Sequence, residues 1–246
     1  MPRLYQSSVL FTGQSLTLGT QQTHYLRHVL RCTVGYRLTV FNEREGEWSA
    51  TITSLAKTGI NITIGEQVCS AVLCPEVVLV FALLKHDPLT FLAEKATELG
   101  VRRLCPVTTE RCNISRLNSD RLLSTLVDAT QQCERFDVPE LSPLMALDKA
   151  LAAWDPETPL FVCQERGQAM PIGKALQSLA PHAAAGFAVG PEGGFSSQEM
   201  ERLQQIPFVR FISLGSRILR AETAALMALA CYQALVGEEI YRVTGT

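Results

Sequence analysis

The sequence has few charges, few aromatic residues and no long apolar run, and each shortage excludes a class of protein. Charged residues make up 19% of the 246 residues and aromatic residues 7%, against 47% hydrophobic residues. Without a run of like charges, a disordered chain is not expected. The apolar stretch Ala224–Cys231 is too short to cross a bilayer, and the first residues lack a signal peptide's basic region, apolar core and cleavage site. We therefore expect a soluble, cytoplasmic protein with a sizeable core.

The sequence also lacks the spacings of a disulfide framework or a metal site. Its eight cysteines form no C-x-x-C pair, and several lie inside apolar segments. This pattern is typical of reduced, buried thiols. The four histidines are scattered without ligand spacing. We expect no bound metal.

Several catalytic motifs are missing. The sequence contains no G-x-G-x-x-G after its first buried strand, no G-x-x-x-x-G-K-[ST], no G-x-S-x-G and no H-E-x-x-H. These absences argue against dinucleotide binding, ATP hydrolysis, serine hydrolysis and zinc proteolysis. The net charge of −2 lacks the basic excess of a typical nucleic-acid binder, although residues 1–70 hold six Lys or Arg against four Glu. Any chemistry must come from main-chain groups, arginines, carboxylates and a bound small molecule.

Residues 1–70 predict a small barrel-like β domain. Short runs rich in Thr, Val and Ile alternate with glycines at Leu16–Leu18, Arg37–Asn42, Trp48–Leu55 and Ile60–Ile64. A helix is predicted at Gln21–Arg31, with Tyr25, Leu26, Val29 and Leu30 spaced to face a core. The outward residues are then His24, Arg27, His28 and Arg31. They can contact RNA phosphates and bases, or form an ordinary solvated face, and the spacing does not decide between the two.

Residues 71–246 predict a second domain of alternating strands and helices, after a linker at Val68–Pro75. Buried strands are expected at Val77–Leu84, Leu104–Thr108, Leu160–Cys163, Gly186–Val189 and Phe208–Leu214. Helices are expected at Leu89–Leu99 with Asp87 as N-cap, after Ser119, after Ser142-Pro143, at Ile172–Leu179 and at Glu222–Val236. This alternation indicates a mostly parallel sheet covered on both faces. The last helix is apolar nearly all round, so it is buried in the core or against a second subunit.

The last two predicted strands are each followed by a loop that combines glycine with charge. These loops are Gly190–Gly194 and Gly215–Arg220. Ligands of α/β sheets bind beyond the carboxyl ends of strands, and glycine allows the main chain to approach a ligand closely. Ser196 and Glu199 form a capping box that should start a helix just past the first loop. We expect the two loops to share one pocket.

The sequence around these loops reads GPEGGFSSQEM and then LGSRILRAETAAL. The paired motifs closely resemble the SPOUT superfamily of methyltransferases. Within it they resemble the bacterial 16S ribosomal RNA uridine N3-methyltransferase family (RsmE), whose target is uridine 1498 in the usual rRNA numbering. Further segments resemble the family's K-x-x-E-L-G-V, S-E-R-C/S and H-x-x-R-V-L-R motifs, at Lys95–Val101, Thr109–Cys112 and His24–Arg31. The resemblance covers nearly the whole chain.

The resemblance implies a PUA-like RNA-binding β-barrel at residues 1–70 and a SPOUT α/β domain with a trefoil knot at residues 71–246. It implies S-adenosylmethionine as cofactor, a homodimer formed partly through the last helix, and 16S rRNA or the assembled small ribosomal subunit as substrate. Carried over by position, the residues of the cofactor loops are Gly190, Glu192, Gly193, Leu214, Gly215, Ile218, Leu219 and Arg220.

The chemistry of the implied reaction favours arginines as catalytic residues. The proton on uridine N3 must leave before methyl transfer, and a nearby arginine would stabilise the resulting anion, while most of the rate comes from placing the reactants. The candidates are Arg220, Arg217 and Arg135. Glu222 or Glu192 can accept the proton or brace a loop, and we favour bracing for Glu192.

One segment departs from the family pattern. Where the family has E-Q-x-G-R followed by a polar or basic residue and V-P, this chain has Glu134 in place of the glycine and Phe136-Asp137 after Arg135. Acidic Glu134 and Asp137 are expected to repel RNA phosphates.

Two other functions stay open. A SPOUT relative can methylate a ribose hydroxyl or another base, and a relative without catalysis can act as an RNA-binding assembly factor. The intact Leu214–Arg220 segment argues against the second.

Overall fold

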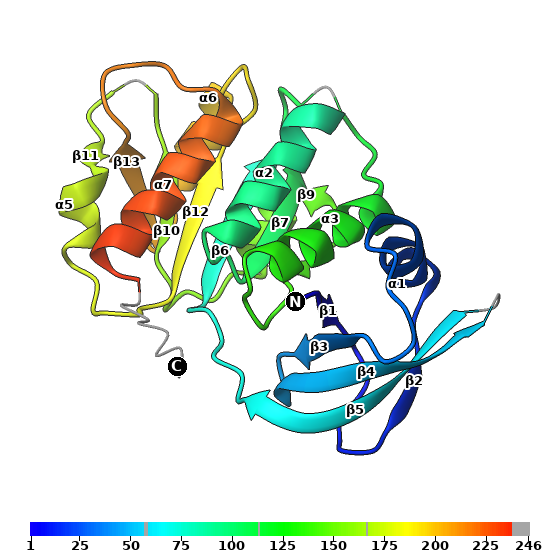
Figure 1. The fold of residues 1–246 in the computed structure, drawn as a ribbon. Coiled ribbons are helices and arrows are strands. Elements are labelled where there is room, and N and C mark those ends of the chain that lie inside the picture. Colours follow the sequence, from blue (N-terminus) through cyan, green and yellow to red (C-terminus); the bar gives the residue numbers. More distant parts are fainter. Residues whose placement is uncertain (57–58, 113, 166, 238–246) are drawn as a thin grey trace. The chain divides into compact units, whose positions relative to one another are not determined.

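The computed structural model describes residues 1–56, 59–112, 114–165 and 167–237 (Figure 1). The chain forms two compact units. The first contains Met1–Leu73 together with Thr130–Val138, and the second contains Cys74–Ala129 and the chain from Pro139 onward. The sequence did not predict that residues 130–138 pack with the first unit.

The first unit is built on a five-stranded sheet in the order β1-β3-β4-β5-β2. Its strands are β1 (Arg3–Tyr5), β2 (Ser15–Thr17), β3 (Arg37–Asn42), β4 (Gly46–Ala56) and β5 (Gly59–Cys69). All pairs are antiparallel except β1 with β3. Leu38, Ile52 and Ile62 are fully buried in its core. Strand β5 continues to Cys69, so the linker predicted from Val68 begins later.

The predicted N-terminal helix is shorter and has a different core face. It consists of α1 (Thr20–His24) and a π-helical turn η1 (Tyr25–Val29). Leu26 is buried as predicted, but Tyr25, Val29 and Leu30 are 42%, 60% and 37% exposed. The Leu30 N–H donates to the carbonyl of Tyr25, five residues back. Because this turn is wider than an α-helical turn, the side chains no longer follow the 3.6-residue period from which the core face was predicted.

Arg3 fastens residues 130–138 to the sheet of the first unit. Its guanidinium carbon lies 3.4 Å from the ring centroid of Phe41 and 5.0 Å from that of Phe136. Its Nη1 donates to the Arg135 carbonyl at 2.9 Å, and its Nε donates to the Glu47 carboxylate at 2.8 Å. A guanidinium that contacts two aromatic rings and a carboxylate is held in a well-defined position.

The second unit is built on an eight-stranded sheet in which every pair is parallel. The order is β11-β13-β10-β12-β6-β7-β8, with β9 also beside β7. The strands are β6 (Val77–Ala82), β7 (Arg103–Thr108), β8 (Glu140–Leu141), β9 (Met145–Ala146), β10 (Leu160–Cys163), β11 (Met170–Pro171), β12 (Ala185–Val189) and β13 (Val209–Ser213). The five predicted strands are present, but β13 is not a buried strand, since only its Ile212 is buried and Arg210 is exposed. The trefoil knot stays a prediction.

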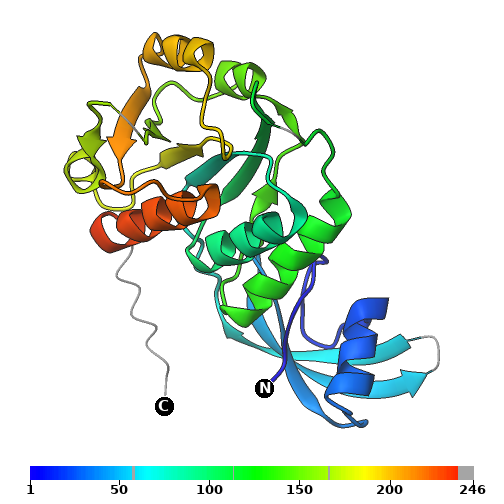
Figure 2. The ribbon, with the colours of Figure 1, turned by 90° about the horizontal axis from the view of Figure 1, so that it is seen from above.

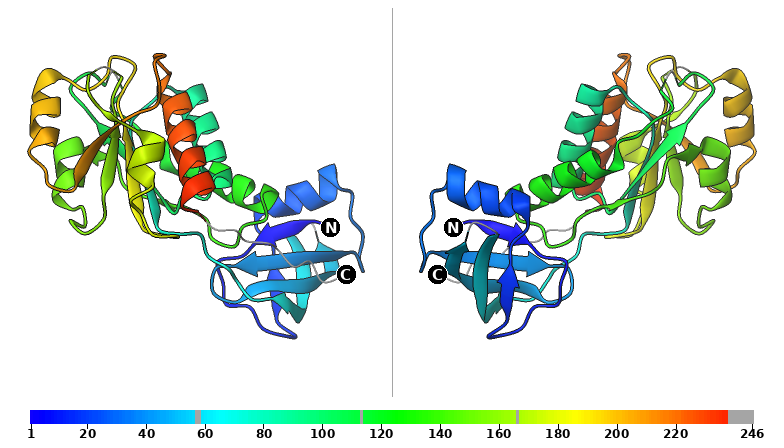
Figure 3. Two further views of the ribbon diagram at one scale, coloured as in Figure 1. Left: turned by 90° about the vertical axis from the view of Figure 1, so that its left-hand side faces the viewer. Right: turned by 90° about the vertical axis from the view of Figure 1, so that its right-hand side faces the viewer.

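Helices cover both faces of this sheet (Figures 2 and 3). Helices α2 (His86–Glu98) and α7 (Ala221–Leu235) lie side by side on one face, and α5 (Ile172–Leu176) contacts α7. On the other face are α4 (Leu147–Ala152) and α6 (Ser197–Gln204). Helix α3 (Ser119–Gln132) follows β7 in the chain. Within the described residues, no helix is both long and apolar enough to cross a membrane.

Three predicted helix starts are wrong. Lys85 is the N-cap residue of α2, and Asp87 lies in its first turn, where a carboxylate favours the positive helix end. Asn118 caps α3 by accepting the Arg121 N–H, so Ser119 is already helical. Ser142-Pro143 precedes the short strand β9, and α4 starts only at Leu147.

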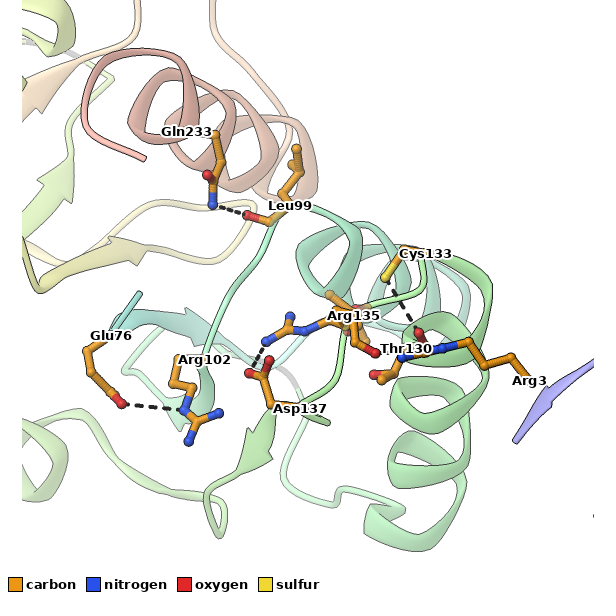
Figure 4. Close-up of polar contacts among 11 residues, drawn as sticks. Arg3, Glu76, Leu99, Arg102, Thr130, Cys133, Arg135, Asp137 and Gln233 are labelled. Carbon is orange, nitrogen blue, oxygen red and sulfur yellow. Dashed lines mark hydrogen bonds and ion pairs between the residues drawn. The ribbon is translucent and has the colours of Figure 1, made fainter. Parts of the chain in front are cut away.

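The last helix is buried on one side only. Ala225, Leu229 and Tyr232 are fully buried, and the Tyr232 hydroxyl donates to the Ala183 carbonyl at 2.7 Å. Gln233 Nε2 donates to the Leu99 carbonyl at 2.8 Å (Figure 4). Met227 and Leu235, in contrast, are 36% and 54% exposed. The predicted burial all round is therefore not present within this chain.

Substitution of Gly186 in β12 tests how tightly the core of the second unit is packed. A Cβ there would lie 2.3 Å from the Trp154 ring, so Gly186→Ala is expected to lower the free energy of unfolding by about 1–3 kcal/mol. Gly173 in α5 has no atom within 4 Å of its Cβ position, so Gly173→Ala should be neutral or slightly stabilising. Urea unfolding of both variants measures the difference, and equal effects would contradict this packing.

Candidate active site

A pocket lies at the carboxyl ends of three neighbouring strands, β10, β12 and β13. Its volume is about 490 Å³. Both loops singled out in the sequence line it, and the lining comprises Arg111, Cys163, Gln164, Glu165, Val189, Gly190, Pro191, Glu192, Gly193, Gly194, Phe195, Met200, Leu214, Gly215, Arg217, Leu219, Ala221 and Ala224. The expectation of one shared pocket is confirmed.

A third wall was missed by the sequence reasoning. Cys163, Gln164 and Glu165 follow β10 and line the pocket. Strand β10 pairs with β12 on one side and β13 on the other, so its carboxyl end must lie between the two glycine loops. The signal was present, since Cys163 ends a predicted buried strand, but only the strand order reveals that this end faces the pocket.

Glycine shapes the pocket walls through the main chain. Gly215 has a φ of 110° and Gly194 a φ of 66°, in the left-handed region that favours glycine. Gly190 has little room for a side chain, because a Cβ there would lie 3.3 Å from the Phe195 ring. The walls therefore present main-chain groups and small surfaces to the cavity.

The predicted capping box at the start of α6 is present and has an additional partner. The Ser196 side chain accepts the Glu199 N–H at 3.1 Å, and Glu199 Oε2 accepts the Ser196 N–H at 2.8 Å. Glu199 Oε1 also accepts the N–H of Glu110 at 2.9 Å. Beside it, Arg111 Nη1 donates to the Gly193 carbonyl at 2.7 Å. The loop is thus braced by Glu199 and Arg111.

Glu192, for which bracing was favoured, is exposed and makes no hydrogen bond among the described residues.

The residues proposed for the two cofactor loops divide into those that line the pocket and those that do not. Gly190, Glu192, Gly193, Leu214, Gly215 and Leu219 line the pocket, together with the catalytic candidate Arg217. Ile218 and Arg220 are not part of the lining, and Ile218 is 63% exposed. Arg220 is the exposed N-cap residue of α7, and Glu222 lies in the first turn of that helix. The structure thus brings most, but not all, of the proposed residues together.

Arg135 lies in the first unit and is engaged in a buried ion pair with Asp137 (Figure 4). The two side chains are 6% and 1% exposed. Asp137 is therefore neutralised inside the unit, and the expectation that it repels RNA phosphates is wrong. Glu134 adopts a φ of 62°, so it keeps the left-handed backbone that the family's glycine would provide.

The four residues proposed to bind RNA lie on or just after α1 and η1. The rings of His24 and His28 are 4.8 Å apart and exposed. Arg27 donates to the Ala56 carbonyl at 2.5 Å, and exposed Arg31 has a φ of 53°. Their contact with RNA stays a prediction. In the part of the chain that the structure describes, no group of His, Cys, Asp or Glu could hold a metal ion.

Two family models match the chain, and they correspond to its two regions. The model of an RNA methyltransferase domain matches residues 73–233, and that of an RNA methyltransferase PUA domain matches residues 18–65. Together they define the class as RNA methyltransferases that carry a PUA domain.

Relatives over nearly the full length identify the family within this class. Ribosomal RNA small subunit methyltransferase E of Rickettsia conorii is 31% identical over 229 residues, covering 93% of each chain. That of Synechocystis is 33% identical, covering 90% of this chain and 74% of the relative. The crystal structure of the Neisseria gonorrhoeae methyltransferase E bound to S-adenosyl methionine superposes with a TM-score of 0.85 at 30% identity, covering 96% of this chain and 98% of the other. The chain belongs to the ribosomal RNA small subunit methyltransferase E family.

Cys163 provides a test of the pocket wall. Burial raises the pKa of its thiol from 9.0 to about 12. The thiol is therefore neutral at pH 8.5, with about a thousandfold less thiolate than an ordinary cysteine. We expect its alkylation by iodoacetamide to rise tenfold per pH unit from about pH 7.5 to 9.5 without levelling off. Peptide mass spectrometry measures the rate, with exposed Cys69 as comparison. A rate that levels off near pH 9 would contradict the raised pKa of the Cys163 thiol.

Proposed function

We propose that this methyltransferase binds S-adenosylmethionine in the pocket and methylates N3 of a uridine in 16S ribosomal RNA, at the position equivalent to 1498. The observation that carries the proposal is the pocket itself. It lies beyond the carboxyl ends of β10, β12 and β13. It occurs in a chain whose Neisseria gonorrhoeae relative, similar over 96% of this chain, was crystallised with that cofactor.

The residues of the pocket fit the cofactor. A volume of about 490 Å³ falls within the roughly 300–1,000 Å³ of small-molecule sites. Val189, Leu214 and Leu219 offer apolar surface for the adenine ring, and the main chain of Gly190, Gly193 and Gly215 would hold polar groups. Charges of both signs, among them Glu165 and Arg217, suit a ligand that carries both. Ile218 and Arg220 lie next to lining residues, and a change in their loop on binding would bring them into the site.

When bound, the cofactor supplies an electrophilic methyl group, and the residues of this chain orient the uridine and stabilise charge. The N3–H of uridine must be lost, which leaves negative charge on the ring. Among the candidate arginines Arg217 lines the pocket, so we give it the role of stabilising this charge. Arg220 and Glu222 flank the pocket at the start of α7, where Glu222 can accept the proton.

Arg135 is the least favoured of the four catalytic candidates. Its guanidinium is already bound to Asp137 inside the first unit. Releasing it would break a buried ion pair, which typically costs about 3–5 kcal/mol. We propose that Arg135 positions the residues around it.

The first unit is proposed to bind the RNA. The PUA model covers His24, Arg27, His28 and Arg31, and the exposed His24–His28 pair can stack on unpaired bases. The net charge of −2 favours a preformed ribonucleoprotein surface over naked RNA, because phosphate attraction is weak. The substrate proposed is therefore the assembled small subunit, which also implies a cytoplasmic enzyme.

Calorimetric titration with S-adenosylmethionine tests the cofactor site. We expect saturable binding to the wild type and at least tenfold weaker binding to Gly215→Val, because valine strains a backbone at φ 110° in a residue that lines the pocket. Gly13→Val is the matched control, since Gly13 also has positive φ, at 80°, with no atom within 4 Å of its Cβ position.

Mass analysis of nucleosides from small subunits that lack the methyl group tests the reaction. The expected product is N3-methyluridine. A ribose-methylated nucleoside would indicate a different reaction, and binding of subunits without any methylation would indicate an assembly factor.

A homodimer is also proposed, with α7 in its interface. Support comes from the apolar residues that α7 leaves exposed, Met227 and Leu235, because exposed apolar faces of this kind mark protein interfaces.

Sedimentation velocity at micromolar protein tests the dimer. We expect a dimer for the wild type and a monomer for Met227→Glu, because the substitution places a charge in the apolar interface. Gln198→Glu, at an exposed position of α6, adds the same charge away from α7 and should stay dimeric. A monomeric wild type would exclude the proposal.

A further inference from the structure

We propose that Glu199 is a positioning residue for methyl transfer: one carboxylate joins the Gly190–Gly194 loop to the Thr109–Arg111 segment and thereby places Arg111 in the pocket. The inference goes beyond the capping role of Glu199 and rests on the proposed function for its kinetic consequence only. Its geometric part stands on hydrogen bonds within the second unit.

Glu199 uses its two carboxylate oxygens for two different parts of the chain. Oε2 accepts the N–H of Ser196, at the end of the glycine loop, at 2.8 Å. Oε1 accepts the N–H of Glu110, 89 positions away in the sequence, at 2.9 Å. The residue is only 2% exposed. A buried carboxylate that accepts main-chain N–H groups on both oxygens fixes the distance between them, since such charge-assisted bonds are short and strong.

The second bond is not required by the helix. A capping box works with either Glu or Gln at the third helical position, because only one side-chain oxygen reaches back to the N-cap N–H. With Gln at position 199, the single oxygen can accept either the Ser196 N–H or the Glu110 N–H, and the NH₂ group would face the other N–H, which is also a donor. Only a carboxylate can therefore hold both N–H groups at once, and this joint contact goes beyond capping.

The residue that this contact places is Arg111. It follows Glu110 directly, lines the pocket, and donates through Nη1 to the Gly193 carbonyl at 2.7 Å. This segment also contacts α6 through an exposed ion pair of Arg202 with Glu110 at 3.4 Å, which contributes little in water. The Glu199–Glu110 bond is a buried contact that holds the main chain beside Arg111.

The test compares Glu199→Gln with Ser196→Ala. Glu199→Gln leaves one side-chain oxygen for two N–H donors, so the variant can no longer hold Ser196 and Glu110 together. Ser196→Ala removes the side-chain cap bond and leaves both carboxylate bonds. For Glu199→Gln we expect kcat to fall at least tenfold with less than a threefold change in KM for S-adenosylmethionine. For Ser196→Ala we expect kcat within threefold of the wild type. Equal losses in the two variants, or a full rate in Glu199→Gln, would overturn the proposal.

A double-mutant cycle tests whether Glu199 acts through Arg111. Arg111→Ala should lower kcat. Adding Glu199→Gln to it should lower kcat less than threefold further, because both changes remove the same contribution, that of a correctly placed Arg111 side chain. Independent, multiplicative losses would contradict the assignment.

Amide hydrogen exchange of the ligand-free protein separates this proposal from the proposed function. Glu199→Gln should speed exchange in the peptide that contains Glu110 at least tenfold, and Ser196→Ala should not. If the wild type fails to methylate, the proposed function fails while this measurement still decides the contact. Unchanged exchange in Glu199→Gln would refute it.

Discussion

The parallel alignment of β13, β10 and β12 is the constraint on which the pocket depends. Phe161 of β10 is aligned with Phe187 of β12 on one side and with Arg210 of β13 on the other. Because the three strands run in one direction, the loops that leave them emerge at one edge of the sheet. Helices cover both faces, so a slip of one residue would move every side chain to the opposite face and disrupt its packing there. The packing of the core therefore fixes where the pocket lies.

The polar contacts then adjust the walls that the strands have placed. Glu199 and Arg111 tie the glycine loop to the end of β7, and both use main-chain partners. The lining also contains the charged residues Arg111, Glu165, Glu192 and Arg217, while Cys163 contributes a neutral thiol because burial raises its pKa to about 12.

Local patterns in the sequence predicted the parts of the fold that depend on local interactions. Strand β10 was predicted with its observed bounds, and the Ser196–Glu199 capping box is present. The three wrong helix starts and the π-helical turn are local failures, whereas the features of the site that were missed depend on tertiary contacts. The third pocket wall required the position of β10 in the sheet, and the second bond of Glu199 required a partner 89 positions away. The π-helical turn after α1 changed which side chains face the core, and no periodicity in the sequence signals such a turn.

The departure from the family pattern around Arg135 is a coherent local structure. Glu134 keeps the left-handed backbone at φ 62°, Phe136 packs edge-on against Phe41, and Asp137 pairs with Arg135. Each altered residue thus has a definite place within the first unit. The Arg135 guanidinium is held in a buried ion pair and is therefore not available to bind a substrate, because freeing it would break that pair. This supports the proposal that arginines already lining the pocket, Arg217 above all, stabilise charge on the uridine.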